Sequence, residues 1–280
     1  MIIDFHTHTF PDQIAAATVE KLRRLSHTTP FTDGTAGGLS ASARAAGVDL
    51  SVVLPVATSP RQVAHINESA ARCNEKTGET GLFSFGCIHP DCPEWKEELG
   101  RVAALGLKGV KLHPVYQEAD LDDPRYLRIL ERAGELGLTV VTHAGFDIGY
   151  PGVVRCSPEM ALRAVRQVGP VTLVLAHMGG WRSWDEVEEL LPGTGVYLDT
   201  AFSLGGIPSD GWYAPEELPM LDQKHFVLLV RKFGAHRILF GTDSPWGGQA
   251  RELEQLRALP LRSEERSAIL GGNARRLLGL

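Results

Sequence analysis

The sequence has few aromatic residues, a deficit of positive charge and no long apolar run. Aromatic residues make up 7% of it, and 28 lysines and arginines are outnumbered by 34 aspartates and glutamates. The resulting net charge of −6 argues against a general nucleic-acid-binding protein, because binding to phosphates needs a basic face. No segment approaches the roughly 20 apolar residues that cross a bilayer, so we expect no membrane span.

The four cysteines do not form a metal-binding or redox motif. They are Cys73, Cys87, Cys92 and Cys156, and none of them has CxxC spacing. Reduced thiols in a cytoplasmic protein are the simplest interpretation. The opening segment MIIDFHTHTF has neither the basic nor the apolar region of a signal peptide, which also predicts a cytoplasmic protein.

Short apolar runs alternate with longer segments of helical period, which is typical of βα units. Runs such as SVVLPV and VTLVLAH are apolar almost throughout, as in strands of a parallel sheet that is buried on both faces. The expected strands are Ile2–His8, Leu50–Val56, Leu82–His89, Gly109–His113, Thr139–His143, Thr172–His177, Val196–Thr200 and Ile238–Asp243. We therefore predict an α/β fold, a single (β/α)8 TIM barrel domain over residues 1–280. An open doubly wound sheet is the alternative, but its usual GxGxxG turn after the first strand is missing.

Capping signals mark the ends of several intervening helices. Residues that favour the N-cap position precede prolines at Ser59-Pro60, Asp123-Pro124 and Ser157-Pro158. Glycines at which we expect C-terminal caps are Gly78, Gly137 and Gly169.

Two long segments are rich in glycine, proline, serine and threonine, and we expect them to be loops. They are Ser26–Gly47, after the first strand, and Ser203–Pro219, after the seventh. Both leave the carboxyl ends of strands, where barrel enzymes have their active sites. They are therefore either lids over the site or plain surface loops.

Histidines and one aspartate lie at the ends of the expected strands. The first strand ends in His6-Thr7-His8, and because side chains alternate along a strand, both histidines point into the barrel mouth. Other strands end in His143, His177 and Asp243. A single buried histidine is usually a hydrogen-bonded core residue. Several imidazoles that converge with a carboxylate instead predict a site for a divalent cation, because without a metal these buried groups would be uncompensated.

Six segments distributed over the whole chain are characteristic of one family: IIDFHTH, GVKLHP, VTHAG, LAHMGG, ILFGTDSPW and GGNARRLLGL. On these segments the chain resembles the amidohydrolase superfamily, in the branch that groups predicted amidohydrolases with metal-dependent decarboxylases. The HxH start and the late GTDSPW together are specific for the superfamily and the branch, but not for a substrate.

The resemblance implies a mononuclear site in which His6, His8, His143 and Asp243 bind one divalent metal. The metal is usually zinc, and manganese is an alternative. The resemblance also implies that Asp243 takes the proton from the metal-bound water, and that His177 polarises water or substrate or binds a second metal. Such a cation lowers the pKa of bound water and polarises a carbonyl oxygen. The resemblance also implies a small-molecule substrate and is compatible with a homodimer, which is common in the family.

The segment GVKLHP leaves several roles open for Lys111 and His113. In binuclear relatives a carboxylated lysine of this strand bridges two metals, which would recruit His143 and His177 to the second metal. An unmodified Lys111 would instead bind a carboxylate or phosphate of the substrate as a point charge, or form a structural ion pair. His113 orients Lys111, contacts the ligand or makes a plain hydrogen bond. Arg182 is a candidate clamp for a substrate carboxylate, or a solvent-facing arginine.

Four further residues each have two expected roles. Trp181, Trp184 and Trp246 either line an apolar pocket or pack at the barrel rim. Asp199 either accepts a hydrogen bond from a metal-binding histidine or is an ordinary polar group at a strand end.

Three functions are compatible with these residues. The first is a metal-dependent hydrolase that activates water on a divalent cation to cleave an amide, lactone or ester-like bond of a small molecule. The alternative is a metal-dependent non-oxidative decarboxylase of a small carboxylic acid. Decarboxylase relatives commonly have longer chains, which favours hydrolysis. A metal-binding regulatory protein without catalysis fits less well, because a ligand set with open metal positions suits catalysis better than storage.

Overall fold

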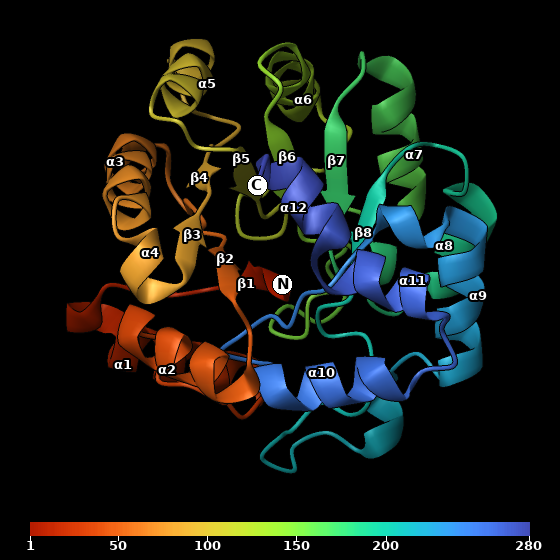
Figure 1. Ribbon diagram of the computed structural model, residues 1–280. Coiled ribbons are helices and arrows are strands. Elements are labelled where there is room, and N and C mark those ends of the chain that lie inside the picture. Colours follow the sequence, from red (N-terminus) through yellow and green to blue (C-terminus); the bar gives the residue numbers. More distant parts are fainter.

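Parallel strands form the centre of the molecule, and helices surround them (Figure 1). The structure is a computed structural model that describes residues 1–280, apart from the side chain of Pro215. The strands are β1 (Ile3–Thr7), β2 (Leu50–Val53), β3 (Leu82–Ser84), β4 (Gly86–Cys87), β5 (Gly109–Leu112), β6 (Thr139–Thr142), β7 (Thr172–Leu175), β8 (Tyr197–Asp199) and β9 (Ile238–Leu239). All eight expected strands are present in shorter form, and the third is divided into β3 and β4.

Neighbouring strands follow the order of the chain, in the two sheets β1-β2-β3 and β4-β5-β6-β7-β8-β9. The two sheets are continuous through Phe85, whose N–H donates to the carbonyl oxygen of Val53 at 2.9 Å. At the other edges, Phe5 N–H donates to the carbonyl oxygen of Phe240 at 2.7 Å, and His8 N–H donates to that of Ser244 at 2.6 Å. These hydrogen bonds join the last strand to the first, and the predicted (β/α)8 barrel is confirmed.

The third expected strand, Leu82–His89, is interrupted where side chains take the place of strand partners. Asn67 accepts from the N–H of Cys87 and donates to its carbonyl oxygen. Asn74 forms the same pair of hydrogen bonds with Ser84. These side chains occupy one edge of β3 and one edge of β4, so the expected strand is divided between the two sheets.

The helices cover the outside of the barrel (Figure 1). They are α1 (Asp12–Ser26), α2 (Ala36–Ala46), α3 (Val63–Asn74), α4 (Thr77–Thr80), α5 (Trp95–Ala104), α6 (Pro124–Glu135), α7 (Pro158–Gln167), α8 (Trp184–Leu190), α9 (Gln223–Phe233), α10 (Gln249–Ala258), α11 (Ser263–Ser267) and α12 (Asn273–Leu278). Short helical turns lie at Pro60–Gln62, His177–Gly179, Pro215–Glu217, Ala235–Arg237 and Ala268–Gly272. Within the described residues, no helix is long and apolar enough to span a membrane.

The predicted helix starts are confirmed, but only one of the three glycine caps is. Helices or helical turns begin at Pro60, Pro124 and Pro158, directly after the three predicted N-cap residues. Gly137 follows α6 with a φ of 67°. Gly78 lies inside α4, and the left-handed cap of that helix is Gly81. Gly169 is not a cap either. The residue that caps α7 is Val168, whose extended conformation needs no left-handed residue after it.

The prediction that Ser26–Gly47 is a loop is wrong for half of the segment, which forms α2. Thr35 caps this helix by accepting from the N–H of Gly38 at 2.9 Å, and the helix buries Leu39 and Ala43. The many glycine, alanine and serine residues hide the apolar period of α2 in the sequence. Ser203–Pro219 contains only the short turn Pro215–Glu217 and is a loop, as predicted.

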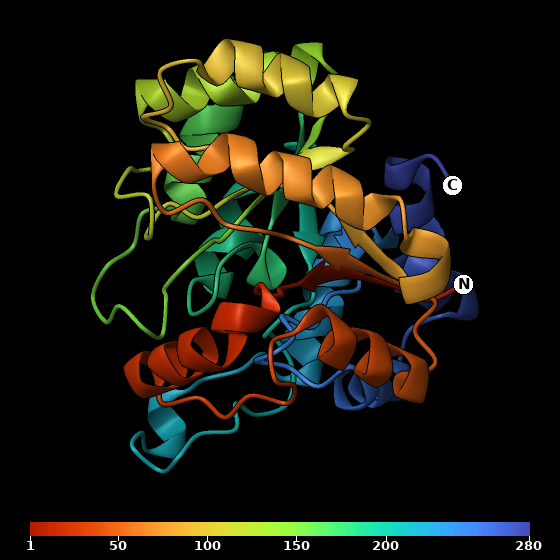
Figure 2. The ribbon, with the colours of Figure 1, turned by 90° about the vertical axis from the view of Figure 1, so that its left-hand side faces the viewer.

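The two long segments contact each other on the side of the barrel away from the chain termini (Figure 2). Thr29 N–H donates to the carbonyl oxygen of Pro208 at 2.8 Å. The rings of His27 and Trp212 stack with centroids 4.4 Å apart. These contacts place residues that are far apart in sequence at the same rim of the barrel.

Candidate metal-binding active site

Two histidines and an aspartate face one another at the carboxyl ends of β1 and β9. His8 Nε2 lies 3.1 Å from both His6 Nε2 and Asp243 Oδ1, and His6 Nε2 lies 3.5 Å from the same oxygen. Ligand atoms bound about 2.1 Å from a tetrahedral ion lie ~3.4 Å apart, so this spacing fits a cation. The structure thus brings together three of the predicted metal ligands.

Hydrogen bonds on the far side of both rings fix the direction of their lone pairs. His6 Nδ1 lies 2.9 Å from Asp199 Oδ2, and His8 Nδ1 lies 2.8 Å from the carbonyl oxygen of Leu54. An ionised carboxylate and a carbonyl can only accept, so each Nδ1 carries a hydrogen and each neutral ring has its lone pair at Nε2. With both rings neutral, two lone pairs would face the oxygen of Asp243, so the arrangement needs a cation between these atoms, either a proton or a metal ion. The donor set fits a divalent metal, and Asp199 has the predicted role of orienting a candidate ligand.

The backbone holds Asp243 against the two imidazoles. Its φ of 62° lies in the left-handed region, which is uncommon for a residue other than glycine. Its N–H donates to the carbonyl oxygen of His6 at 2.8 Å, and its own carbonyl accepts from Trp246. Burial alone would raise the pKa of Asp243, but His6 and His8 hold that pKa well below its ordinary value. The carboxylate is therefore ionised at neutral pH and can bind a cation or accept a proton.

Lys111 points from β5 toward the same cluster. It is fully buried, and its Nζ lies 3.2 Å from His6 Nε2. Burial lowers the pKa of Lys111 to about 8, although the charges of Asp199 and Asp243 oppose this shift. Among the described residues, no carboxylate oxygen lies within 4.0 Å of Nζ. The amine is thus available to a ligand that approaches the metal-binding atoms.

His177 and His143 form a hydrogen-bonded pair beside this cluster. His177 Nε2 lies 3.1 Å from His143 Nδ1, and the ring centroids of His177 and His6 are 5.5 Å apart. The nitrogens of His143 face His177 on one side and Asp147 on the other. The structure does not bring His143 into the group of His6, His8 and Asp243, so its binding to that metal stays a prediction.

His113, His143 and Asp147 form a second buried group. Asp147 Oδ2 lies 3.7 Å from His113 Nε2 and 3.9 Å from His143 Nε2. The ring of His113 stacks on those of His143 and Tyr116. Burial raises the pKa of Asp147 to about 6 and lowers the pKa values of both histidines well below their ordinary value. Asp147 is missed by sequence analysis, because it follows the strand in a loop where no periodic pattern marks it.

Arg182 and two of the tryptophans lie at the rim of the barrel. The guanidinium carbon of Arg182 lies 5.4 Å from the ring centroid of Phe146 and 5.6 Å from that of Trp181. Trp181 and Trp184 are buried, and Trp184 Nε1 donates to the carbonyl oxygen of His177 at 3.0 Å. The tryptophans therefore pack at the rim, while the exposed Arg182 is not part of either group of histidines.

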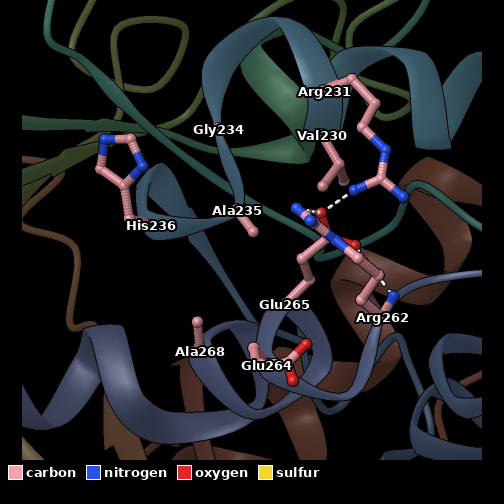
Figure 3. A pocket seen from close by; sticks show the side chains of 9 residues that line it. All are labelled: Val230, Arg231, Gly234, Ala235, His236, Arg262, Glu264, Glu265 and Ala268. Atoms are coloured by element: carbon pink, nitrogen blue, oxygen red, sulfur yellow. Dashed lines mark hydrogen bonds and ion pairs between the residues drawn. The ribbon is translucent and has the colours of Figure 1, made fainter.

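A cavity of about 350 Å³ lies at the other end of the barrel, between α9 and α11 (Figure 3). Its arginines, Arg231 and Arg262, both pair with Glu265. Its wall includes Ala235, which precedes β9, so the cavity lies near the amino end of that strand. Among the described residues that line it, none is a predicted site residue, and we do not assign the activity to this cavity.

Comparison with known proteins identifies the family. Residues 3–280 match the family model described as amidohydrolase. The chain belongs to the amidohydrolase family. No curated protein matches this amidohydrolase in sequence.

Three solved structures share the fold of this amidohydrolase. An uncharacterised TIM-barrel protein from Bordetella bronchiseptica is 20% identical, with coverage of 99% of this chain and 98% of that one and a TM-score of 0.74. A 5-carboxyvanillate decarboxylase from Novosphingobium aromaticivorans, solved with bound manganese and 3-methoxy-4-hydroxy-5-nitrobenzoic acid, is 13% identical, with coverage of 100% and 97% and a TM-score of 0.71. A putative 2-pyrone-4,6-dicarboxylic acid hydrolase from Pseudomonas putida is 22% identical, with coverage of 99% and 97% and a TM-score of 0.66. At these identities the likeness shows the fold, and both reaction classes are present among the neighbours.

Proposed function

We propose that this amidohydrolase is a metal-dependent hydrolase that cleaves an amide, lactone or ester-like bond of a small molecule, and that residues 1–280 form its single domain. The observation that carries the proposal is the group of His6, His8 and Asp243, in which two fixed lone pairs and a carboxylate face one another. The manganese bound to the decarboxylase of the same fold also supports a divalent metal in this protein.

A divalent cation held by His6, His8 and Asp243 would polarise a carbonyl group and lower the pKa of a water molecule at the site. Zinc and manganese both suit imidazole and carboxylate ligands. We propose zinc, with manganese as the alternative.

Two residues of the chain are suited to move protons in this reaction. Asp243 is ionised at neutral pH, because His6 and His8 hold its pKa low, and its carboxylate can accept a proton from an attacking water molecule. The Nδ1 hydrogen of His177 is held by the carbonyl oxygen of Ala201, so Nε2 is its basic nitrogen. Nε2 can take up a proton and return it to a leaving group when it exchanges its hydrogen bond with His143 Nδ1 for one to the reacting group. The hydrogen bond to Ala201 orients the ring toward the cluster.

Two cationic side chains are suited to bind an acidic substrate. Lys111 is buried beside His6 with a pKa of about 8, so it is mostly charged at neutral pH and can bind a carboxylate as a point charge. Arg182 lies at the rim over Phe146 and Trp181 and can bind a second carboxylate in a bidentate manner. We propose a small substrate that carries at least one carboxylate.

A non-oxidative decarboxylase is the second candidate. It is supported by the presence of decarboxylases among the solved structures of the same fold, including the 5-carboxyvanillate decarboxylase. Lys111 and Arg182 would then hold the same acidic substrate, but a carbon–carbon bond would break.

Product analysis separates the two candidates. Zinc- or manganese-loaded protein is assayed with a panel of lactones, esters, amides and aromatic carboxylic acids, and products are analysed by mass spectrometry together with released CO2. A hydrolase adds one water molecule to its substrate and releases no CO2. Asp243→Asn is expected to lose this activity, whereas Asp185→Asn, which changes a fully exposed carboxylate, keeps it. Release of CO2 would support the second candidate, and full metal occupancy without turnover of either kind would reject both.

A further inference from the structure

A chain of hydrogen bonds fixes the position of the proton on His143. His177 Nδ1 lies 3.0 Å from the carbonyl oxygen of Ala201, which can only accept, so this nitrogen carries the hydrogen. The lone pair of neutral His177 is therefore at Nε2, 3.1 Å from His143 Nδ1. His143 must donate there, and its own lone pair is then at Nε2.

The Nε2 lone pair of His143 is buried and lacks a hydrogen-bond partner among the described residues. The residue is only 7% exposed, and Nε2 lies 3.9 Å from Asp147 Oδ2. His113 Nε2 lies 3.7 Å from the same oxygen. A lone pair that faces a carboxylate oxygen at this distance forms no hydrogen bond. When Asp147 is ionised both atoms are Lewis bases, so a cation between them stabilises the arrangement.

We propose that His113, His143 and Asp147 form a second binding site for a divalent cation, separate from the group of His6, His8 and Asp243. One donor atom from each of the three residues lies within 4.8 Å of the others. Two imidazoles and a carboxylate form a donor set that holds zinc with an open position in other proteins. This site goes beyond the proposed function, which uses only the first group as metal ligands. It assigns His143, which the resemblance implies as a ligand of the first metal, to the second metal instead.

Neighbouring contacts prepare these residues for a cation. Asp147 Oδ1 accepts from the N–H of Gly149 at 2.8 Å, which orients the carboxylate and leaves Oδ2 for a ligand. Within the described residues His113 Nδ1 makes no hydrogen bond, so His113 can carry its hydrogen there and present the lone pair of Nε2. The rings of His113 and His143 are stacked at an angle of 13°. Because each lone pair lies in the plane of its ring, binding of one cation by both would require His113 to turn relative to His143, which stays hydrogen-bonded to His177.

The second site is connected to the first through His143 and His177. A cation at His143 Nε2 withdraws electrons from the ring, which strengthens the donation from its Nδ1 to His177 Nε2. His177 lies beside His6, so occupancy of the second site orients a residue that acts at the first.

Metal binding itself tests the proposal, independently of turnover. Metal-free protein is titrated with Zn²⁺ by calorimetry, and with Co²⁺ by absorption spectroscopy. The wild type is expected to bind two equivalents and Asp147→Asn only one. Asparagine keeps the oxygen that accepts from Gly149 and replaces Oδ2 with an uncharged amide, so the metal-free variant is expected to keep its fold and its Tm. His113→Gln removes a different ligand and is expected to weaken the second equivalent at least about tenfold. A wild type that binds one equivalent, or an Asp147→Asn variant that binds two, would overturn the proposal.

Two further variants separate this site from the other metal arrangements. Asp243→Asn weakens metal binding at the first site and is expected to bind the second equivalent as the wild type does. Binding at the second site can therefore be measured even if the proposed hydrolysis fails. Lys111→Met removes the lysine that would bridge a binuclear centre of the carboxylated type, and the second equivalent is expected to remain. If Lys111→Met lost the second metal equivalent while Asp147→Asn retained it, the proposed ligands would be wrong. Asp185→Asn is the control and binds two equivalents.

Discussion

His8 Nε2 lies 3.1 Å from Asp243 Oδ1, although almost the whole chain separates these two residues. The contact depends on closure of the barrel, because β1 and the segment after β9 become neighbours only when the last strand meets the first. His8 N–H donates to the carbonyl oxygen of Ser244 at the same place. The candidate metal site therefore lies at the junction of the first and last strands.

His6→Ala is expected to abolish binding of the first metal ion and turnover together while the barrel stays folded. His6 supplies one of three ligand atoms, and its hydrogen bond to Asp199 holds it in place. Metal content by mass spectrometry and the far-ultraviolet circular dichroism spectrum check this prediction. His65→Ala, on the exposed side of α3, keeps metal and activity. Wild-type turnover by metal-depleted His6→Ala would contradict the metal mechanism.

Asp243→Asn is expected to reduce kcat about 10²- to 10⁴-fold, the usual contribution of a positioned proton acceptor, and to change KM much less. Asparagine resembles aspartate in shape but cannot accept the proton. Steady-state kinetics at saturating metal concentration measure both constants. An increase in KM with an unchanged kcat would assign Asp243 to substrate binding instead.

Lys111→Met is expected to raise KM for substrates with a carboxylate and to leave neutral lactones or esters less affected. The amine has a pKa of about 8, so it is charged below pH 8 and loses its charge as the pH rises through that value. The wild-type KM for acidic substrates therefore increases above pH 8, and the variant lacks this increase. Kinetics of an acidic substrate and its methyl ester, measured at pH 7 and pH 9 with metal content verified, test this role.

Glu252 is expected to make the protein less stable at alkaline pH. Burial raises the pKa of this carboxyl group to about 8, and the negative charges of Asp4 and Asp243 add to the effect. The folded state thus retains a proton that the unfolded chain releases near pH 4.5. The contribution of Glu252 to stability is therefore greatest below that pH and is lost as the pH rises through 8. One pKa unit corresponds to ~1.4 kcal/mol. Between pH 5 and pH 8.5 we expect Tm to fall less in Glu252→Gln than in the wild type. If Tm depended on pH equally in both proteins, Glu252 would not be the group responsible.

The strands and their polar ends could be predicted from local sequence. A run such as VTLVLAH is apolar on both faces, and the polar residue that ends it must lie where the barrel opens. The strand ends alone predict that His6, His8, His143, His177 and Asp243 face the barrel mouth. Fold class and the composition of the first group therefore follow from patterns a few residues long.

Other parts of the site depend on contacts that no local pattern encodes. The orientation of His143 is set by its hydrogen bond to His177, from a different strand, and Asp147 joins it from a loop. In α2, the many small residues reduce the difference in hydrophobicity between the two faces of the helix. The burial of Leu39 is therefore evident only in the folded structure. Ring orientation and loop position are properties of tertiary packing, and sequence analysis cannot supply them.

Closure of the barrel between β1 and the segment after β9 makes the proposed metal ion a reversible cross-link between the two ends of the polypeptide. No peptide bond spans that junction, so a cation bound by His8 and Asp243 closes a loop of nearly the full chain length, as a disulfide bond would. The energy of metal binding then adds to the stability of the fold in proportion to the logarithm of metal concentration. Chelation is thus expected to loosen β1 first, which links the availability of metal to the resistance of the amino-terminal strand to proteolysis.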